Sequence, residues 1–274
     1  MKTRISVSID REVLSRLDRE VDNVKVFSRS EAIEKIIEAH VSEKKKCIIL
    51  AGGPPEKLYI KELGCYRPLV KVKGHTLIED IIRKARKANY SEILIIGSKE
   101  LLSAIYSAIG DGKAVDVTIE YLEEKEPLGS GKTLAMARQQ IKNTFLFMPC
   151  DHYFEINLEE VEAYHKKNRQ TATLVVYSGT EQEWNQSSIV SLEGNIVTKY
   201  IEKPKKAETH LTALMIGFAE PEIFSHIPAG RINWSLQENI FAELAKQRKL
   251  VGYLYSGKWK NVHSKKDAEE LSSQ

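Results

Sequence analysis

A short apolar segment that ends in two glycines constrains the fold of this chain more than any other stretch. Residues 47–51 read C-I-I-L-A, and Gly52 and Gly53 follow them. An apolar run of this length is typical of a buried strand, and a glycine pair after it indicates either a plain turn or a close approach of the backbone to another group. In an open α/β sheet, the loop leaving such a strand lies at the carboxyl edge, where backbone N–H groups can face phosphate. We therefore predict a ligand-binding loop at Ala51, Gly52 and Gly53.

Beyond this segment, helical and strand patterns alternate along the chain. Apolar residues recur at helical spacing in some stretches and form short strand-like runs between them; in chain order these stretches are 78–88, 93–96, 101–109, 115–121, 134–141 and 145–148. Such alternation predicts an α/β fold with a mostly parallel sheet that is covered on both faces. Residues 189–192 and 196–201 flank Gly194 and Asn195 and predict a β-hairpin, so the later part departs from simple βα winding.

The first strand and a second motif after it resemble the opening of the sugar nucleotidylyltransferases. That family has the pattern L-A-G-G-x-G-T-R-L and, after a gap, K-P-L-(L/V)-x-V-x-G-x-P-(L/M)-I. Residues 50–58 (L-A-G-G-P-P-E-K-L) and 67–78 (R-P-L-V-K-V-K-G-H-T-L-I) align with these patterns without insertion or deletion. The resemblance implies a Rossmann-like nucleotidyltransferase fold over residues 46–274, in which a sugar-1-phosphate attacks the α-phosphorus of a nucleoside triphosphate.

A further motif extends the resemblance to the nucleotide. Residues 127–134 (P-L-G-S-G-K-T-L) are similar to the family's P-L-G-T-A-x-A-L, which implies nucleotide contacts at Leu128, Gly129 and Ser130. A capped helix start is the alternative interpretation of the same residues. A Walker A loop is excluded, because Glu126 stands where that loop needs a glycine.

The sugar side carries an E-K-P motif. By the resemblance, Glu202 contacts the sugar and Lys203 contacts its phosphate. Met215 stands where the family has a small glycine that gives the sugar room, so this end of the site is expected to be altered.

Two positions imply a magnesium site. Asp151 follows the predicted strand 145–148, as the family's metal-binding aspartate does; the alternative is a turn or helix cap. Residues 259–267 resemble W-x-D-(V/I)-G-T-x-x-D, and Asn261 stands where the family has its second metal-binding aspartate. Because an amide oxygen lacks the full negative charge of a carboxylate, the predicted Mg²⁺ site is weakened.

The phosphate-handling residues also depart from the family. Lys57 stands where the family has Arg and Arg67 where it has Lys, so the two implied catalytic cations are exchanged. Pro54 and Pro55 have no N–H, and two lost donors to charged phosphate would cost about 3 to 6 kcal/mol. Glu56 adds a carboxylate beside the expected phosphates. Together these changes indicate lost or altered transfer chemistry.

Residues 1–44 have a different pattern. Ile5, Val7 and Ile9 alternate with polar residues as in a short strand, and two helical patterns follow. This order resembles the ribbon-helix-helix DNA-binding domains over residues 3–41, in which two chains pair their strands in the major groove. A segment this small cannot bury a core alone, so a homodimer or higher homo-oligomer is expected. The resemblance implies DNA contacts at Lys2, Arg4, Ser6, Ser8, Ser28, Arg29 and Ser30.

Charge does not favour DNA. Residues 1–44 hold nine Lys/Arg and nine Asp/Glu, which gives a net charge of zero, and the whole chain carries only +3. The alternative for this segment is therefore a dimerisation module that never contacts DNA.

Cysteine usage and hydropathy limit which other classes of protein this chain can belong to. Cys47, Cys65 and Cys150 are widely spaced and odd in number, which predicts neither a disulfide framework nor a zinc site. The sequence has no apolar run of about 18 residues and no signal-peptide pattern, so we expect a cytoplasmic protein without membrane contacts.

These features lead to one leading hypothesis and two alternatives. The leading hypothesis is a DNA-binding transcriptional regulator whose nucleotidyltransferase-like domain senses a nucleotide or sugar nucleotide, or serves in assembly. The first alternative is an active Mg²⁺-dependent sugar-phosphate nucleotidylyltransferase that is oligomerised by its N-terminal segment. In the second, both parts are purely structural.

Overall fold

The chain folds as two compact units, Met1–Lys44 and Lys45–Gln274. The structure, a computed structural model, describes residues 5–21, 26–41, 45–179, 187–206 and 209–272. Within those ranges, every helix is too short or too polar to cross a membrane.

The first unit contains two helices, α1 (Arg11–Glu20) and α2 (Arg29–Val41). Helix α1 begins after Asp10, whose carboxylate accepts the backbone N–H of Glu12 at 2.8 Å. The strand predicted over residues 5–9 is not formed, and none of the described strands pairs with this segment. An isolated strand leaves its N–H and C=O groups without partners, so the apolar alternation alone does not produce one in a single chain.

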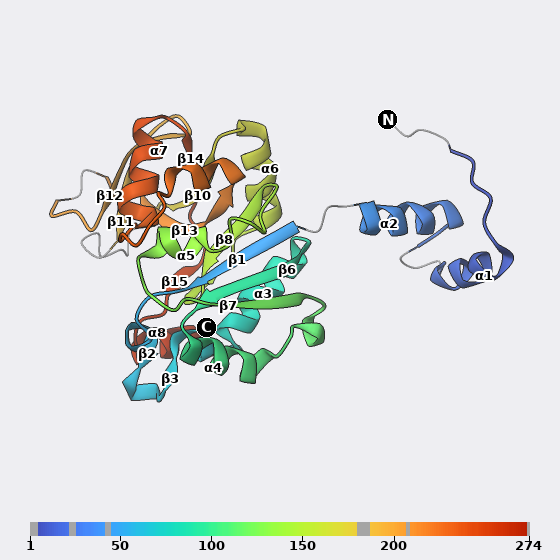
Figure 1. Cartoon of the computed structure of the whole chain (residues 1–274), viewed down its shortest axis with the longest axis horizontal. Helices are drawn as coiled ribbons and strands as arrows, with labels where there is room; N and C mark the ends of the chain where they lie inside the picture. The colour runs from blue at the N-terminus through green and yellow to red at the C-terminus, as the bar shows by residue number, and fades with distance from the viewer. Residues whose placement is uncertain (1–4, 22–25, 42–44, 180–186, 207–208, 273–274) are drawn as a thin grey trace. The chain divides into compact units, whose positions relative to one another are not determined.

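The second unit is built on one large sheet. The strands of this sheet are β1 (Lys45–Ala51), β6 (Tyr90–Gly97), β7 (Thr118–Glu123), β8 (Phe145–Pro149), β10 (Ala172–Tyr177), β11 (Ser188–Glu193), β12 (Ile196–Glu202), β13 (Thr212–Ala219) and β14 (Leu250–Tyr255). Their order across the sheet is β10-β14-β12-β11-β13-β8-β1-β6-β7 (Figure 1). The predicted hairpin is present as the antiparallel pair β11 and β12.

The sheet has two halves of different character. Strands β8, β1, β6 and β7 are parallel neighbours. Strand β13 runs antiparallel to β8, and the further pairs of this half are antiparallel except β10 with β14, which is parallel. The α/β fold is therefore confirmed, while the prediction of a mostly parallel sheet holds for one half only, because in the other half the hairpin of β11 and β12 and the reversed strand β13 introduce antiparallel pairs.

Helices cover both faces of the sheet, as the alternation predicts (Figure 1). On one face, Cys47 and Ile49 of β1 belong to a core with residues of α3 (Leu77–Lys87), α4 (Lys99–Ile109), α6 (Leu158–Asn168) and α8 (Lys265–Ser272). On the other face, Ile48 and Leu50 share a core with residues of α5 (Ser130–Ala135), the π-helix Leu236–Phe241 and α7 (Ala242–Lys246). A strand that is apolar on both faces is what two such layers require.

Short strands pair beside the main sheet. These are β2 (Tyr59–Ile60) with β3 (Cys65–Tyr66), β4 (Lys71–Val72) with β5 (His75–Thr76), and β9 (His152–Phe154) with β15 (Trp259–Asn261). The last pair matters most for the site, since it brings the segment after β8 beside a segment more than a hundred positions later in the chain.

Candidate nucleotide-binding site

A cavity of about 270 Å³ lies beyond the carboxyl ends of β1 and β8. Its lining residues come from six separate parts of the chain: Leu50, Gly52, Gly53, Leu58, Gly129, Ser130, Thr133, Pro149, Cys150, Asp151, His152, Met215, Gln237 and Asn261. Six residues predicted from sequence are therefore brought to one place, in the crevice position where open α/β sheets bind ligands.

The glycine loop is closely packed. A side chain at Gly52 would begin 2.6 Å from Oγ1 of Thr133 and 2.8 Å from Oε2 of Glu124, so only glycine fits. Gly53 has φ +96°, a backbone conformation that favours glycine. Its N–H donates to Oε2 of Glu124 at 2.7 Å.

The proline pair continues this internal bonding. Pro55 begins a short 3₁₀ helix, Pro55–Leu58, in which the N–H of Lys57 donates to the carbonyl of Pro54 at 3.0 Å. Pro54 and Pro55 have no N–H to offer. The backbone of this loop therefore leaves few donors for phosphate, and side-chain cations must hold an anion here.

Glu124 was not found from the sequence, although it shapes the loop. It follows β7, is only 6% exposed, and accepts the hydroxyl of Thr133 at 2.5 Å in addition to the N–H of Gly53. In the sequence it is hidden in an acidic run that looks like a solvated surface.

The second predicted nucleotide loop is fixed by a neighbouring segment. Leu128 accepts the N–H of Trp234 at 2.8 Å, and Gly131 donates to the carbonyl of Trp234 at 2.8 Å. Gly129 has φ +92°, and a side chain there would begin 2.6 Å from Oδ1 of Asn233. Ser130 lines the cavity, whereas the side chain of Leu128 does not.

Asp151 is paired with a predicted catalytic cation. Its carboxylate is bound by Nη1 of Arg67 at 3.0 Å, and both side chains are largely buried. Its backbone carbonyl accepts the N–H of Val262 at 2.9 Å, which fixes the segment after β8 against β15. The structure thus brings Arg67 to the cavity edge through Asp151.

Asn261 fits the predicted metal site. It lies on β15 opposite His152, and its Oδ1 is buried without a hydrogen-bond partner among the described residues. Mg²⁺ takes oxygen ligands and is usually held by one or two carboxylates together with substrate phosphates. One carboxylate on Asp151 and one unpartnered amide oxygen on Asn261 match that donor set, although the described residues contain no cluster of three or more His, Cys, Asp or Glu that could hold a metal.

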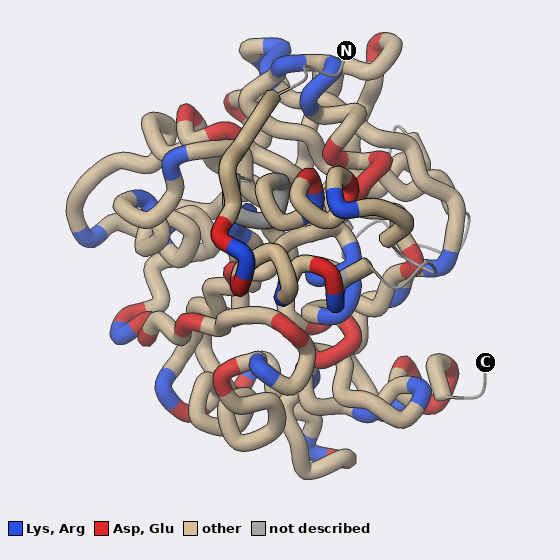
Figure 2. Tube along the Cα trace, turned by 90° about the vertical axis from the view of Figure 1, so that its right-hand side faces the viewer, with Lys and Arg blue, Asp and Glu red and all other residues tan. Residues whose placement is uncertain are grey.

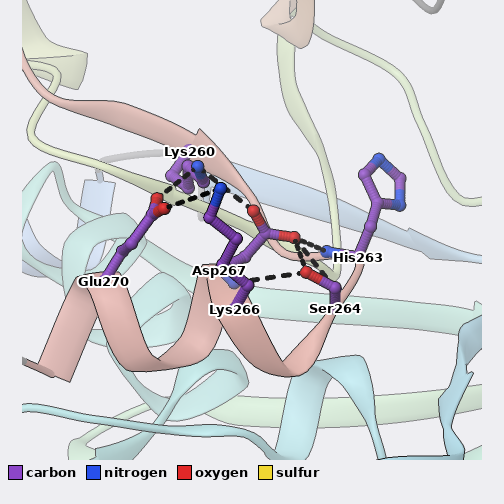
Figure 3. Close-up of polar contacts among 6 residues, drawn as sticks. All are labelled: Lys260, His263, Ser264, Lys266, Asp267 and Glu270. Carbon is purple, nitrogen blue, oxygen red and sulfur yellow. Dashed lines mark hydrogen bonds and ion pairs between the residues drawn. The ribbon is translucent and has the colours of Figure 1, made fainter.

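A polar network holds the segment that carries Asn261 (Figure 3). Nζ of Lys260 lies 3.1 Å from Asp267 and 2.7 Å from Glu270 of α8. Asp267 also accepts the N–H groups of His263 at 3.0 Å and Ser264 at 2.9 Å. The ring of His263 points away from Asp267 (Figure 3), and desolvation together with the positive charge of Arg67 lowers its pKa.

His152 is a cavity residue that sequence reasoning did not identify. It is 6% exposed, and its Nδ1 lies 3.3 Å from Nε1 of Trp259, which can only donate. Burial lowers the pKa of His152 to about 4. The ring is therefore neutral near pH 7 and contributes no charge to the cavity.

The remaining predicted residues do not line the cavity. Ala51 is buried within β1, and Lys57 is exposed on the short helix after Pro54. Glu202 accepts the hydroxyl of Ser188, and Nζ of Lys203 lies 3.9 Å from Glu202.

The predicted DNA-contact residues are divided between described and undescribed parts of the chain. Lys2 and Arg4 lie outside the described residues, and Ser6 and Ser8 are exposed. Ser28 caps α2 by accepting the N–H of Glu31 at 3.1 Å. Arg29 is bound by Asp18 through two hydrogen bonds, at 2.6 and 2.9 Å.

Basic side chains of the first unit are matched by acidic ones. Figure 2 shows Lys and Arg interspersed with Asp and Glu along the trace. Arg16 and Lys35 form ion pairs with Glu12 at 2.6 Å and Glu31 at 3.1 Å. Phosphate binding needs cations that can lie against the phosphates, and Arg16 and Lys35 already lie against carboxylates of this chain.

Fold and cavity together define an α/β protein with a cavity at the carboxyl edge of its sheet. Residues 46–273 match the nucleotidyl transferase family. Because this match covers most of the sequence, the chain belongs to that family.

Individual relatives agree with this assignment. The chain is 29% identical over 255 residues to a mannose-1-phosphate guanylyltransferase regulatory subunit alpha-A of Danio rerio, with 80% of this chain and 59% of the relative covered. It is 23% identical over 224 residues to a mannose-1-phosphate guanylyltransferase of Mycobacterium tuberculosis, with 80% and 61% covered. The chain thus spans about three fifths of the length of these curated relatives.

A solved structure shares the fold. A crystal structure from Bacillus anthracis, provisionally named a glucose-1-phosphate thymidylyltransferase and determined in complex with a sucrose, superposes with a TM-score of 0.75. The match covers 84% of this chain and 94% of that one at 19% identity.

These comparisons correct the leading hypothesis. The relatives are guanylyltransferases and their subunits, and the matched family is that of nucleotidyl transferases, so the prediction of a DNA-binding transcriptional regulator is wrong. The charge balance of the first unit is consistent with this correction, since three of its five described basic residues, Arg16, Arg29 and Lys35, are paired with carboxylates.

Proposed function

We propose that this chain is a sugar-1-phosphate nucleotidylyltransferase. A phosphate oxygen of the sugar-1-phosphate forms a bond to the α-phosphorus of a nucleoside triphosphate, the bond to the β-phosphate oxygen breaks, and pyrophosphate leaves. The observation that carries the proposal is the cavity itself, which gathers Gly52, Gly53, Ser130, Asp151 and Asn261 at one sheet edge of a nucleotidyl transferase family member.

The chain's own residues would divide the work between alignment and charge neutralisation. Arg67 is held at the cavity by Asp151, while Lys57, which precedes the cavity residue Leu58, and Lys203 would be further cations for phosphate. Asp151 and Asn261 would hold Mg²⁺, which supplies neutralisation of phosphate charge when bound. Since Glu124 occupies the N–H of Gly53, the phosphates depend on these side chains more than on the glycine loop.

Pyrophosphate release tests the proposal. Purified protein is assayed with Mg²⁺, the four common nucleoside triphosphates and several sugar-1-phosphates, starting with GTP and mannose-1-phosphate because of the substrates that the relatives' names give. We expect turnover with at least one pair and a loss of at least about 100-fold in Asp151→Ala. Asp111→Asn, a change of an exposed aspartate on the same unit, is the matched control and should retain activity.

Two results would contradict the proposal. One is the absence of turnover with every pair, although the protein is folded. The other is turnover that survives Asp151→Ala unchanged, which would place the chemistry elsewhere.

We also propose that the first unit associates with a second copy of itself. Its apolar side chains are mostly exposed: Ile5 by 68%, Val7 by 65% and Phe27 by 65%, whereas Leu17 and Ala32 are its buried apolar residues in the described part. A unit of this size gains little stability alone, so pairing would supply the missing burial.

Light scattering on the full chain tests this association. We expect the mass of a dimer or a higher oligomer, and a shift toward monomer in Val7→Glu, while the exposed change Leu254→Glu on the second unit leaves the mass unchanged. A monomeric wild-type chain across the concentration range would contradict the proposal.

A further inference from the structure

One cavity residue presents a hydrogen-bond donor that the protein itself does not use. Gln237 lies on the π-helix Leu236–Phe241, lines the cavity, and is partly exposed. Its Oε1 accepts the hydroxyls of Ser130 at 2.9 Å and Ser235 at 3.1 Å. The oxygen end of the amide is thus bound twice.

The two serines are themselves fixed by the backbone. Oγ of Ser130 accepts the N–H of Leu236 at 2.9 Å, and Oγ of Ser235 accepts the N–H of Glu238 at 3.2 Å. Each hydroxyl therefore has its proton to donate, and both protons are directed at Gln237. With the oxygen held in this way, Nε2 is the end of the amide that is left for the cavity, and no described residue accepts a hydrogen bond from it.

The helix type is consistent with a functional position. Leu236, Ile240 and Phe241 are fully buried in the core beneath α7, while Gln237 stays at the cavity. Single turns of π-helix are rare and occur frequently at functional sites, since the extra residue redirects a side chain without moving the core.

The charge of the cavity limits what Gln237 can meet. Of the described residues that line it, Asp151 is the one with a carboxylate, and Arg67 is paired with that carboxylate. Lys132 of α5 is directed elsewhere, with its ammonium donating to the carbonyls of Pro228 and Gly230. The part of the cavity beside Gln237 therefore suits an uncharged part of a ligand, with phosphates on the side of Asp151, Asn261 and Arg67.

We propose that Gln237 is a substrate-contact residue whose Nε2 donates a hydrogen bond to an uncharged acceptor oxygen of the substrate. That oxygen belongs to a hydroxyl of the sugar or to a carbonyl of the nucleobase. Ser130 and Ser235 act as positioning residues that keep the donor end of the amide toward the ligand. This inference rests on the proposed nucleotidylyl transfer and adds a specificity residue to it.

Steady-state kinetics of two variants test the inference. Gln237→Met removes the donor with little change in size, and Gln237→Glu presents an acceptor in its place. One lost neutral hydrogen bond corresponds to about 3- to 10-fold in KM, and an opposed acceptor to about 10- to 100-fold, with kcat largely retained. Gln247→Met is the matched control, because Gln247 is an exposed glutamine that bonds Glu243 away from the cavity.

The two substrates form separate arms of the experiment. KM is first measured for the nucleoside triphosphate at saturating sugar-1-phosphate. It is then measured for the sugar-1-phosphate at saturating nucleoside triphosphate. A rise in the triphosphate arm assigns the acceptor to the base, and a rise in the sugar arm assigns it to the sugar. Ser130→Ala should raise the same KM by a smaller factor, because the amide of Gln237 is then free to turn.

The outcomes separate this inference from the proposed function. If the wild-type chain neither turns over nor binds any nucleotide or sugar nucleotide in calorimetry, the proposed function fails and takes the inference with it. If the wild-type chain is active and Gln237→Met and Gln237→Glu both match Gln247→Met in KM, the inference alone is overturned. Should Gln237→Met fail to fold, Gln237→Glu, which has the same size as the native residue, decides the question.

Discussion

The two halves of the sheet bring different chemistry to one cavity. The parallel half contributes charged and loop-forming residues: Asp151 after β8, the glycines after β1 and Glu124 after β7. The antiparallel half contributes uncharged side chains, Met215 from β13 and Gln237 from the π-helix that packs against that half.

This difference follows from strand direction. Parallel strands all end at the same edge, so the loops after β1, β7 and β8 converge and can concentrate charge. Antiparallel strands divide their ends between both edges, so that half reaches the cavity through a residue within a strand and a residue on a covering helix. Under the proposed function, Asp151 of the parallel half would hold the metal and Gln237 would recognise an uncharged group, while Lys203, which follows β12, would add a cation for phosphate from the other half.

The largest effect is expected when the ion pair between Arg67 and Asp151 is broken. Arg67→Met leaves the buried carboxylate of Asp151 without its cation, and we expect the free energy of unfolding to fall by about 3 kcal/mol in denaturant titrations. The double variant with Asp151→Asn should recover part of that loss. Arg83→Met removes an exposed ion pair with Glu79 and should cost less than about 1 kcal/mol. Equal losses in the free energy of unfolding for Arg67→Met and Arg83→Met would show that the buried pair stabilises the fold no more than the exposed pair does.

A somewhat smaller effect is expected at the glycine loop. Glu124→Gln replaces a charged acceptor of the Gly53 N–H and the Thr133 hydroxyl by a neutral one, so stability should fall by about 1 to 2 kcal/mol. Glu123→Gln changes the exposed neighbour and should stay within about 0.5 kcal/mol of the wild type. Chemical denaturation measures both variants, and indistinguishable midpoints would argue that Glu124 does not anchor the loop.

The assignment of Asn261 to the metal site can be tested by placing a carboxylate at this position. Asn261→Asp adds a second negative charge beside Asp151, and we expect the Mg²⁺ affinity in calorimetric titrations to rise by about 10-fold. Asn239→Asp, which keeps its acceptor for the N–H of Ser235 but does not line the cavity, should leave Mg²⁺ binding unchanged. Unaltered affinity in Asn261→Asp would remove Asn261 from the metal site.

The smallest effect concerns pH and the antiparallel half. His165 is buried between Thr173 and Glu220, and burial lowers its pKa below the ordinary value of 6.5. The unfolded chain then binds more protons than the folded one just below pH 6.5, so stability is full above that pH and falls as pH decreases. One such group can contribute a slope of at most about 1.4 kcal/mol per pH unit.

Denaturation at several pH values between neutral and acid checks this slope. His165→Gln keeps polar groups for both partners but does not titrate, so the fall in stability below pH 6.5 should become shallower. An unchanged slope in that variant would show that His165 does not contribute to the pH dependence.

Residues that follow parallel strands could be predicted from sequence for a physical reason. An apolar run followed by Gly52 and Gly53, or by Asp151, marks both a buried strand and its functional end in one local pattern. The convergence of these ends at one cavity then follows from the parallel arrangement itself.

Other residues carry no such local pattern. Glu124 is hidden in an acidic run, and Gln237 lies in a stretch where the apolar spacing is that of a π-helix. Their roles depend on hydrogen bonds to Gly53 and Ser130, residues that are distant in the sequence. Residues 5–9 are the opposite case. Their sequence has the alternating pattern of a strand, but the strand is not formed, because no strand among the described residues pairs with this segment.

A crystal structure of the chain with Mg²⁺ and a nucleoside diphosphate sugar tests the division of labour between the halves most directly. We predict the diphosphate beside Arg67 with the metal on Asp151 and Asn261, and an uncharged acceptor oxygen of the ligand within hydrogen-bond distance of Nε2 of Gln237. A ligand bound away from this cavity, or one whose phosphates lie against Gln237 and Met215, would contradict the account.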